Sequence, residues 1–292
     1  MKSTLTIGMP VFNDIDFIEQ SIKSILNLKD VDFILIISDD GSTDGSAEIC
    51  LKYAEEDKRI KYIRQQRNLG ISKNMEFLLG LADTPYFMWA ADDDLWDPYF
   101  ASILIQLLQN NPKAIAAFSI YNEINETNEQ TNEIVDINYS NNNRYKRLVY
   151  FIKNANDGLG YGIFKTNKIK HVTFPVWWWP NHKTPYNNIY PTLCYYLTLG
   201  DYSFYNERAL FYKRVKTIQN TNHYTTGKGN GIFELSSFVI RRFNLITYSS
   251  KLIKSKSSFL FMVKIYPNLF YHWFLKESIF EIKKALINKI KK

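Results

Sequence analysis

Three consecutive carboxylates, Asp92-Asp93-Asp94, are the residues whose type and spacing suggest chemistry most directly. They follow Tyr86–Ala90, an apolar run of strand composition, and after Leu95-Trp96 the pair Asp97-Pro98 is typical of the N-cap and first turn of a helix. Adjacent carboxylates repel one another, so holding three at a strand end costs free energy unless a cation lies among them. A hard divalent ion with oxygen ligands suits such a group, and a nucleotide diphosphate often accompanies such an ion. The alternative is a solvated acidic turn that caps a helix.

A second acidic stretch, Asp39-Asp40-Gly41-Ser42-Thr43-Asp44, also follows an apolar run and leads into a helical pattern. A carboxylate there can accept a hydrogen bond from the imide N–H of a pyrimidine or bind a ribose hydroxyl. The alternative is that Asp39 and Asp40 only cap the next helix. The segment from Arg67 to Asn74 opens another helical pattern and offers amide and backbone N–H groups to an anion.

The elements that position these residues alternate along the first 120 residues. Short apolar runs predict strands at Leu5–Met9, Phe33–Ser38, Ile60–Arg64, Tyr86–Ala90 and Ala114–Ile120. Apolar residues at three- and four-residue steps predict helices within 15–26, 47–54, 71–82 and 100–108. This alternation predicts a mainly parallel sheet covered on both faces. Ligands of such sheets bind beyond the carboxyl ends of the strands, which brings Pro10–Asp14, Asp39–Asp44 and Asp92–Asp94 together.

The second half is less regular. Eight asparagines and few apolar residues over 121–144 predict an exposed loop. Arg144–Lys153 and Ile189–Leu199 have helical patterns, and Tyr202–Tyr205 has a strand pattern. Gly158–Phe164 predicts a glycine-rich strand under a ligand or another backbone.

Composition narrows the class of protein. The 292 residues are 46% apolar, which is ample for a buried core. Cys50 and Cys194 form neither a disulfide framework nor a zinc-type spacing, which favours a reducing compartment. The N-terminus is too short and polar for a signal peptide, and no uncharged apolar run reaches the roughly 18–20 residues needed to span a bilayer. We expect a cytoplasmic protein.

The net charge of +7 belongs to the end of the chain. Residues 251–292 contain ten lysines and two glutamates, whereas the other residues carry 26 basic and 27 acidic side chains. Such a helical basic region can lie peripherally on the anionic inner face of a membrane, or pack onto the domain with its lysines solvated. Nucleic-acid binding is disfavoured because no basic groove with stacking aromatics appears in the globular part.

Four motifs in order resemble the signature of family 2 glycosyltransferases with the GT-A fold. They are Pro10-Val11-Phe12-Asn13, Asp39-Asp40-Gly41-Ser42-Thr43-Asp44, Asn68-x-Gly70-x3-Asn74 and Asp92-Asp93-Asp94-Leu95-Trp96. Each motif is common, but the ordered set is specific, and the resemblance covers roughly residues 3–122. It implies an α/β fold with a Rossmann-like, mainly parallel sheet and flanking helices, to which the composition of the chain's end adds a C-terminal helical basic extension. It also implies a transferase that uses Mn²⁺ or Mg²⁺ and a nucleotide-sugar donor. UDP is the nucleotide expected from the family alone.

The resemblance also implies roles for residues. Asp39 or Asp40 would contact the base, and the triplet corresponds to the family's DxD-type element. By register against Leu95-Trp96, Asp93 is the expected metal ligand and Asp92 a ribose or bridging contact. Ala91 lies at a position where the family motif usually has another Asp. Which residues of the triplet would bind the metal and which the ribose therefore stays open. The implied donor-binding residues are Pro10, Phe12, Asn13, Asp39, Asp40, Asn68, Gly70, Asn74 and Asp92, and the implied metal ligands are Asp93 and Asp94.

The sequence matches the family least well at the position of the catalytic base. Inverting family members usually carry Asp or Glu just before the helix expected at Ile189–Leu199, but 181–189 contains no carboxylate. His182 is the residue there that can take a proton near neutral pH. Asp157 and Asp201 are carboxylates that the fold could bring near. We expect His182, in preference to Asp157, to deprotonate the acceptor; the alternative for His182 is an ordinary hydrogen-bonding histidine.

Two further features have both a functional and an ordinary interpretation. Trp177-Trp178-Trp179 could form a stacking platform for a sugar or a wall beside a lipid-linked acceptor, or could pack in the core. Lys213-Arg214 resembles a basic pair near the family's diphosphate site, or is a solvated charge pair.

We therefore predict a glycosyltransferase domain at 1–215, with a nucleotide-sugar-binding half at 1–122 and an acceptor-binding half at 123–215, followed by a basic helical region at 216–292. The expected reaction transfers a hexose-type sugar to a hydroxyl of a surface-glycan or lipid-linked glycan acceptor, with inversion. One alternative is a catalytically silent sugar-nucleotide or glycan-binding homologue that lacks the usual base. Another is a nucleotidyltransferase, which the absence of a glycine-rich basic loop after the first strand disfavours.

Overall fold

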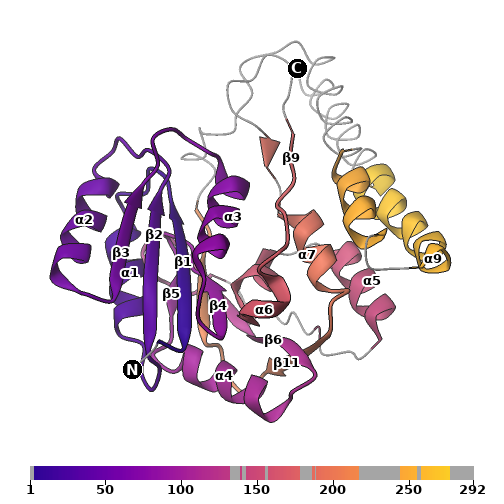
Figure 1. Ribbon diagram of the computed structural model, residues 1–292, viewed down its shortest axis with the longest axis horizontal. Coiled ribbons are helices and arrows are strands. Elements are labelled where there is room, and N and C mark those ends of the chain that lie inside the picture. Colours follow the sequence, from indigo (N-terminus) through magenta and orange to yellow (C-terminus); the bar gives the residue numbers. More distant parts are fainter. Residues whose placement is uncertain are drawn as a thin grey trace.

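The computed structural model describes residues 3–131, 139, 143–154, 157–177, 186–187, 189–216, 244–254 and 258–276. Figure 1 shows an N-terminal layer of strands between helices, with the later helices gathered on the other side of the molecule. The helices are α1 (Ile18–Leu26), α2 (Ser46–Glu56), α3 (Ile71–Leu81), α4 (Phe100–Asn110), α5 (Arg144–Asn154), α6 (Thr166–Ile169), α7 (Tyr190–Tyr196) and α9 (Phe259–Phe270). Residues 244–254 are also helical.

A seven-stranded sheet forms the core, with the order β11-β6-β8-β4-β1-β2-β3. Its strands are β1 (Leu5–Val11), β2 (Phe33–Asp39), β3 (Ile60–Arg64), β4 (Tyr86–Trp89), β6 (Ala114–Ser119), β8 (Ile163–Lys165) and β11 (Asp201–Tyr205). β1 pairs in parallel with β2 and β4, and every residue of β1 is buried. A strand covered on both faces needs a continuous apolar sequence, which explains the composition of β1. The predicted parallel α/β sheet is confirmed.

One strand of this sheet runs the other way. β8 is antiparallel to both β4 and β6 and lies between them. A Cβ atom on Gly162, just before β8, would lie 2.2 Å from the Phe118 ring and 2.6 Å from the Ala117 carbonyl oxygen. The glycine therefore allows the close backbone approach that the sequence predicts. The predicted strand at Gly158–Phe164 is wrong in its first part, because Asp157–Tyr161 forms a 3₁₀ turn (η1).

A small second sheet joins distant parts of the chain. It has the order β5-β12-β7, with β5 at Leu95–Trp96, β12 at Phe211–Arg214 and β7 at Tyr121–Ile124. The prediction of a loop from residue 121 is therefore wrong for Tyr121–Ile124, which pairs in parallel with β12. Because β5 directly follows the acidic triplet, this sheet anchors the triplet to β12.

The described C-terminal helices pack on the second half of the molecule. Tyr271–Lys276 (η3) continues α9 as a π-helical turn, and its buried Trp273 donates a hydrogen bond to the Ile152 carbonyl of α5 at 2.8 Å. Within the described part of the chain, no helix combines the length and apolar character needed to cross a membrane.

Candidate functional site

The loops that follow β1, β2 and β4 meet at one edge of the sheet. These three strands are parallel neighbours, so their carboxyl ends point the same way. The loop after β1 is tied to the loop after β2, because the Asn13 N–H donates to Ser42 Oγ at 3.0 Å and the Thr43 N–H donates to Asn13 Oδ1 at 2.8 Å. The Phe12 N–H donates to Asp92 Oδ2 at 3.2 Å, which ties the same loop to the triplet.

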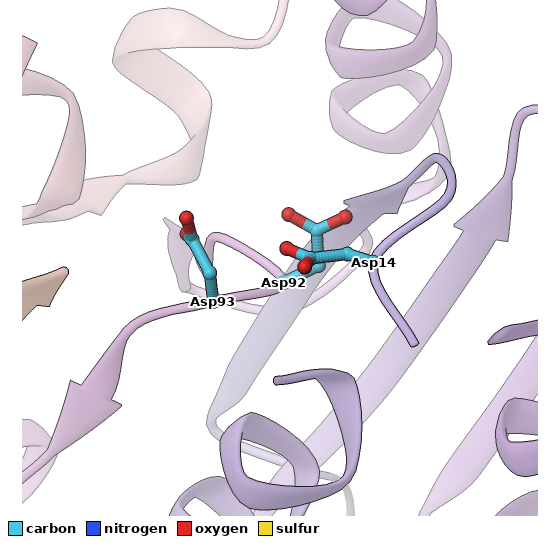
Figure 2. A group of neighbouring side chains, drawn as sticks. All are labelled: Asp14, Asp92 and Asp93. Atoms are coloured by element: carbon cyan, nitrogen blue, oxygen red, sulfur yellow. The ribbon is translucent and has the colours of Figure 1, made fainter. Parts of the chain in front are cut away.

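Three carboxylates converge at this edge. Asp14 lies after β1, and Asp92 and Asp93 lie after β4 (Figure 2). One oxygen atom of each residue lies within 4.8 Å of the others. The backbone N–H of Asp14 donates to Ser46 Oγ at 2.9 Å, which holds this residue against the start of α2. We call Asp14, Asp92 and Asp93 the acidic group.

The acidic group carries an excess of negative charge. Burial raises the pKa of Asp14 to about 6, against the opposing effect of the Lys216 ammonium. Burial, together with the charges of Asp14 and Asp93, also raises the pKa of Asp92 well above its ordinary value. Lys216 Nζ lies 2.7 Å from Asp14 Oδ2 and 3.0 Å from Asp93 Oδ2. Three converging carboxylates with unfavourable mutual repulsion are a donor set that fits a hard divalent cation such as Mn²⁺ or Mg²⁺.

Asp94 lies outside the acidic group. Its side chain is buried, and Asp94 Oδ1 accepts a hydrogen bond from the Arg214 backbone N–H at 2.7 Å. The Arg214 side chain in turn donates to the carbonyl oxygens of Asp93 and Asn125 at 2.8 and 2.7 Å. Arg214 is thus a buried anchor that fixes the backbone of the triplet to β12. The role of Asp94 as a metal ligand stays a prediction.

Asp39 and Asp40 are buried and already have donors. Asp39 accepts from the Ser42 N–H and the Tyr62 hydroxyl, both at 2.8 Å, and pairs with Arg64 at 3.2 Å. Asp40 accepts from the backbone N–H groups of Leu69 and Gly70 at 2.7 and 2.8 Å. These contacts join the loop after β2 to the start of α3. Contact of either carboxylate with a nucleotide base stays a prediction.

The remaining predicted donor-binding residues have different surroundings. Pro10 is buried in β1, whereas Phe12 is 38% exposed and Asn13 adopts a positive φ of 53°. Asn68 and Gly70 lie before α3, where Asn68 Oδ1 accepts from the Gly70 N–H at 2.9 Å. The interior residue among them is Asn74: its side chain donates to the Ser38 carbonyl at 2.8 Å and ties α3 to β2.

The candidate bases are only partly described. Asp157 forms an ion pair with Lys213 of β12, and its charge contributes to the raised pKa of Asp94, so it lies near the triplet. Asp201 begins β11, which runs parallel to β6, and therefore lies at the opposite edge of the sheet. His182 lies outside the described residues, as do Trp178, Trp179 and the side chain of Trp177.

Two residues of the site were missed by sequence reasoning. Asp14 follows Asn13 in a loop that the predicted topology already places at the edge, and its carboxyl group was a signal that could have nominated it. Lys216 has no such signal. It is 202 positions from Asp14 in the sequence, and the pairing of β12 with β5 and β7 brings it to the site.

Comparison with known proteins agrees with this geometry. The family model "Glycosyl transferase family 2" matches residues 6–173. A cholesterol galactosyltransferase of Borreliella burgdorferi is 39% identical over 116 residues, which cover 39% of this chain and 30% of that protein. The matched segments of the first curated relatives span 20 to 40% of their length.

Solved structures share the fold. S. aureus TarS 1–349 in complex with UDP-GlcNAc has a TM-score of 0.63 at 12% identity, covering 90% of this chain and 73% of that one. The mannosyltransferase PcManGT from Pyrobaculum calidifontis, in complex with GDP-Man and Mn²⁺, has a TM-score of 0.52 at 12% identity, covering 92% of this chain and 68% of that one. The family match spans more than half of the chain and includes the sheet edge that carries the acidic group. The chain therefore belongs to glycosyl transferase family 2.

Proposed function

We propose that this protein transfers a sugar from a nucleotide-diphosphate sugar to an acceptor hydroxyl with the help of Mn²⁺ or Mg²⁺. The acidic group carries this proposal, because Asp14, Asp92 and Asp93 converge where parallel α/β sheets bind their ligands. Nucleotide sugars are bound by the structural neighbours TarS and PcManGT, the latter with Mn²⁺. A divalent ion held there would neutralise charge on the departing diphosphate.

The other residues of the edge would bind and orient the donor. Asp39 or Asp40 would face the nucleoside, Asn68 and Gly70 would contact the donor from the start of α3, and Asn74 would hold α3 against β2. His182 or Asp157 would take the proton of the acceptor hydroxyl, with inversion at the sugar carbon. For Asp157 to act as a base, its carboxylate must exchange its ion pair with Lys213 for a contact with the acceptor.

We also propose that α9 and the basic region hold the enzyme at a membrane surface, near a lipid-linked or glycan acceptor. One side of α9 buries Ile265 and Leu269, while Phe259, Leu260 and Val263 are 77%, 73% and 52% exposed. An exposed apolar helix face beside lysines suits an anionic lipid surface. The named galactosyltransferase relative, whose acceptor is a lipid, supports the same idea.

Donor turnover tests the transferase proposal. UDP-, GDP- and dTDP-sugars are incubated with Mn²⁺, and nucleotide release is compared between the wild type and Asp93→Ala. Release of one nucleotide that is lost in EDTA and in the variant supports the proposal. If calorimetry shows no Mn²⁺-dependent nucleotide binding and no donor is turned over, the proposal fails. Metal-dependent binding of a donor, with neither hydrolysis of the donor nor transfer of its sugar to any glycan offered, would favour the silent homologue instead.

Vesicle binding tests the membrane proposal. We expect the wild type to sediment with vesicles that contain phosphatidylglycerol, and Leu260→Glu with Val263→Glu to reduce the bound fraction several-fold. Both positions are exposed, so the thermal unfolding midpoint should stay unchanged. Equal sedimentation of the wild type and the double variant would exclude α9 as the contact.

A further inference from the structure

Lys216 occupies the place where charge compensation of the acidic group is needed. Its Nζ atom lies 2.7 Å from Asp14 Oδ2 and 3.0 Å from Asp93 Oδ2, so one ammonium bridges two of the three carboxylates. The side chain is 29% exposed. Its ammonium lies within ion-pair distance of both carboxylates.

The backbone fixes where this ammonium can reach. Lys216 follows Arg214, which is anchored to the triplet, and Val215, whose N–H donates to the Ile124 carbonyl at 2.8 Å. The Lys216 ammonium also lies 5.1 Å from the centre of the Phe17 ring, which gives it a second favourable contact. The lysine therefore approaches the acidic group from a fixed point on the second sheet.

A divalent ion held by the acidic group and this ammonium would share the carboxylates of Asp14 and Asp93. A cation bound by Asp14 and Asp93 would lie within a few ångströms of Nζ, and the repulsion between the two would be strong in this half-buried place. We propose that Lys216 is a tethered cation that occupies the acidic group in the metal-free protein and must be displaced when a divalent ion binds. It thereby stabilises the metal-free state and weakens the affinity for the ion. This inference rests on the metal site of the proposed function.

Calorimetry with Mn²⁺, alone and with UDP added, tests the inference. The variants are Lys216→Met, which keeps the length of the side chain without its charge, and Lys216→Arg, which keeps the charge. Lys23→Met is the matched control, because Lys23 pairs with Glu19 on the exposed face of α1. We expect Lys216→Met to bind Mn²⁺ at least about tenfold more tightly, whereas Lys216→Arg and Lys23→Met stay near the wild type; tenfold corresponds to about 1.4 kcal/mol.

Thermal unfolding gives a second readout that does not depend on activity. In EDTA, Lys216→Met should unfold at a lower temperature than the wild type, because Asp14 and Asp93 then repel each other without a cation. In saturating Mn²⁺ this difference should shrink or reverse, since tighter binding stabilises the folded state more. Lys23→Met should show neither effect.

The outcomes separate the inference from the proposed function. Mn²⁺ binding that is equally strong in the wild type and Lys216→Met, or weaker in the variant, overturns the inference and leaves the metal site standing. If no variant binds Mn²⁺ even with UDP, the metal site itself fails and the inference falls with it. If Lys216→Met does not fold, a wild-type affinity in Lys216→Gln overturns the inference in the same way.

Discussion

Two acidic regions share one edge of the sheet but differ in how their charges are compensated. Asp39 and Asp40, after β2, accept hydrogen bonds from backbone N–H groups, a tyrosine hydroxyl and an arginine. The acidic group of Asp14, Asp92 and Asp93 has the Phe12 N–H and the Lys216 ammonium among the described residues. Asp39-Asp40 and Asp92-Asp93 look alike in the sequence, since each pair belongs to a run of aspartates after an apolar strand.

The difference shows that the number of aspartates does not identify a cation site. The carboxylates after β2 accept hydrogen bonds from several backbone and side-chain donors, so they stabilise the connection between β2 and α3. The acidic group instead concentrates like charges that few donors compensate, which is the arrangement that a cation stabilises. The first region should therefore matter more for folding, and the second for ligand binding.

The largest effect is expected for Asp14→Asn. The substitution removes one ligand oxygen and a charge, so Mn²⁺ affinity and donor turnover should each fall by more than about 100-fold. The loss of repulsion within the acidic group should keep the free energy of unfolding within about 1 kcal/mol of the wild type. Calorimetry and urea unfolding measure the two quantities. Full turnover in Asp14→Asn would remove Asp14 from the site.

Asp40→Ala should have the opposite profile. It leaves the N–H groups of Leu69 and Gly70 without this acceptor, so the free energy of unfolding should fall by about 2–4 kcal/mol. Urea unfolding measures the loss, and Mn²⁺ binding by the folded fraction should persist. A variant as stable as the wild type would contradict the structural role and leave donor binding as the function of Asp40.

Arg214→Met tests the link between the regions and the second sheet. Removing the guanidinium takes the Arg214 donor from the carbonyls of Asp93 and Asn125, of which the Asn125 carbonyl keeps the Asn128 N–H, at a cost of about 2–3 kcal/mol in unfolding free energy. Mn²⁺ affinity should also fall, because the backbone of Asp93 loses its anchor. Arg208→Met is the control: Arg208 forms an exposed pair with Asp97, and its loss should cost less than about 1 kcal/mol. Equal losses of unfolding free energy in Arg214→Met and Arg208→Met would contradict the role of Arg214 as an anchor.

The smallest effect is expected for Ser46→Ala. Ser46 Oγ accepts from the Asp14 N–H and donates to Asp44, so it holds the loop after β1 against α2. Its loss should cost about 1 kcal/mol and weaken Mn²⁺ binding a few-fold, without changing the number of bound ions. Urea unfolding measures the loss of stability, and calorimetry measures the Mn²⁺ affinity and the number of bound ions. An unchanged Mn²⁺ affinity would mean that the Asp14 backbone is held adequately by its other contacts.

Local sequence patterns were sufficient for the parallel part of the fold. β3 has the predicted bounds, and β1 and β2 extend the predicted strands by two residues and one residue. These strands are continuous apolar runs between turn-forming residues, and the helices between them have clear apolar stripes. Such signals depend on neighbours in the sequence.

The pairing of strands that are far apart in the sequence could not be predicted from such local patterns. β5, β7 and β12 are two to four residues long and are strands only because they meet one another. Their polar and asparagine-rich surroundings predict a loop at β7. The same distance hides Lys216, whose contact with Asp14 and Asp93 depends on β12. The sequence therefore predicts Asp92 and Asp93 at the edge but not the lysine beside them.

The position of β8 has a consequence for the order in which the chain can fold. β8 lies between β4 and β6, although it follows β6 by more than 40 residues in the sequence. Until Ile163–Lys165 emerges during synthesis, β4 has an unpaired edge and β6 has no partner in this sheet, because its other neighbour, β11, follows later still in the sequence. Unpaired edges are sites of wrong association between chains. The nascent protein therefore carries its complete donor-side motifs well before it can close the sheet that supports them.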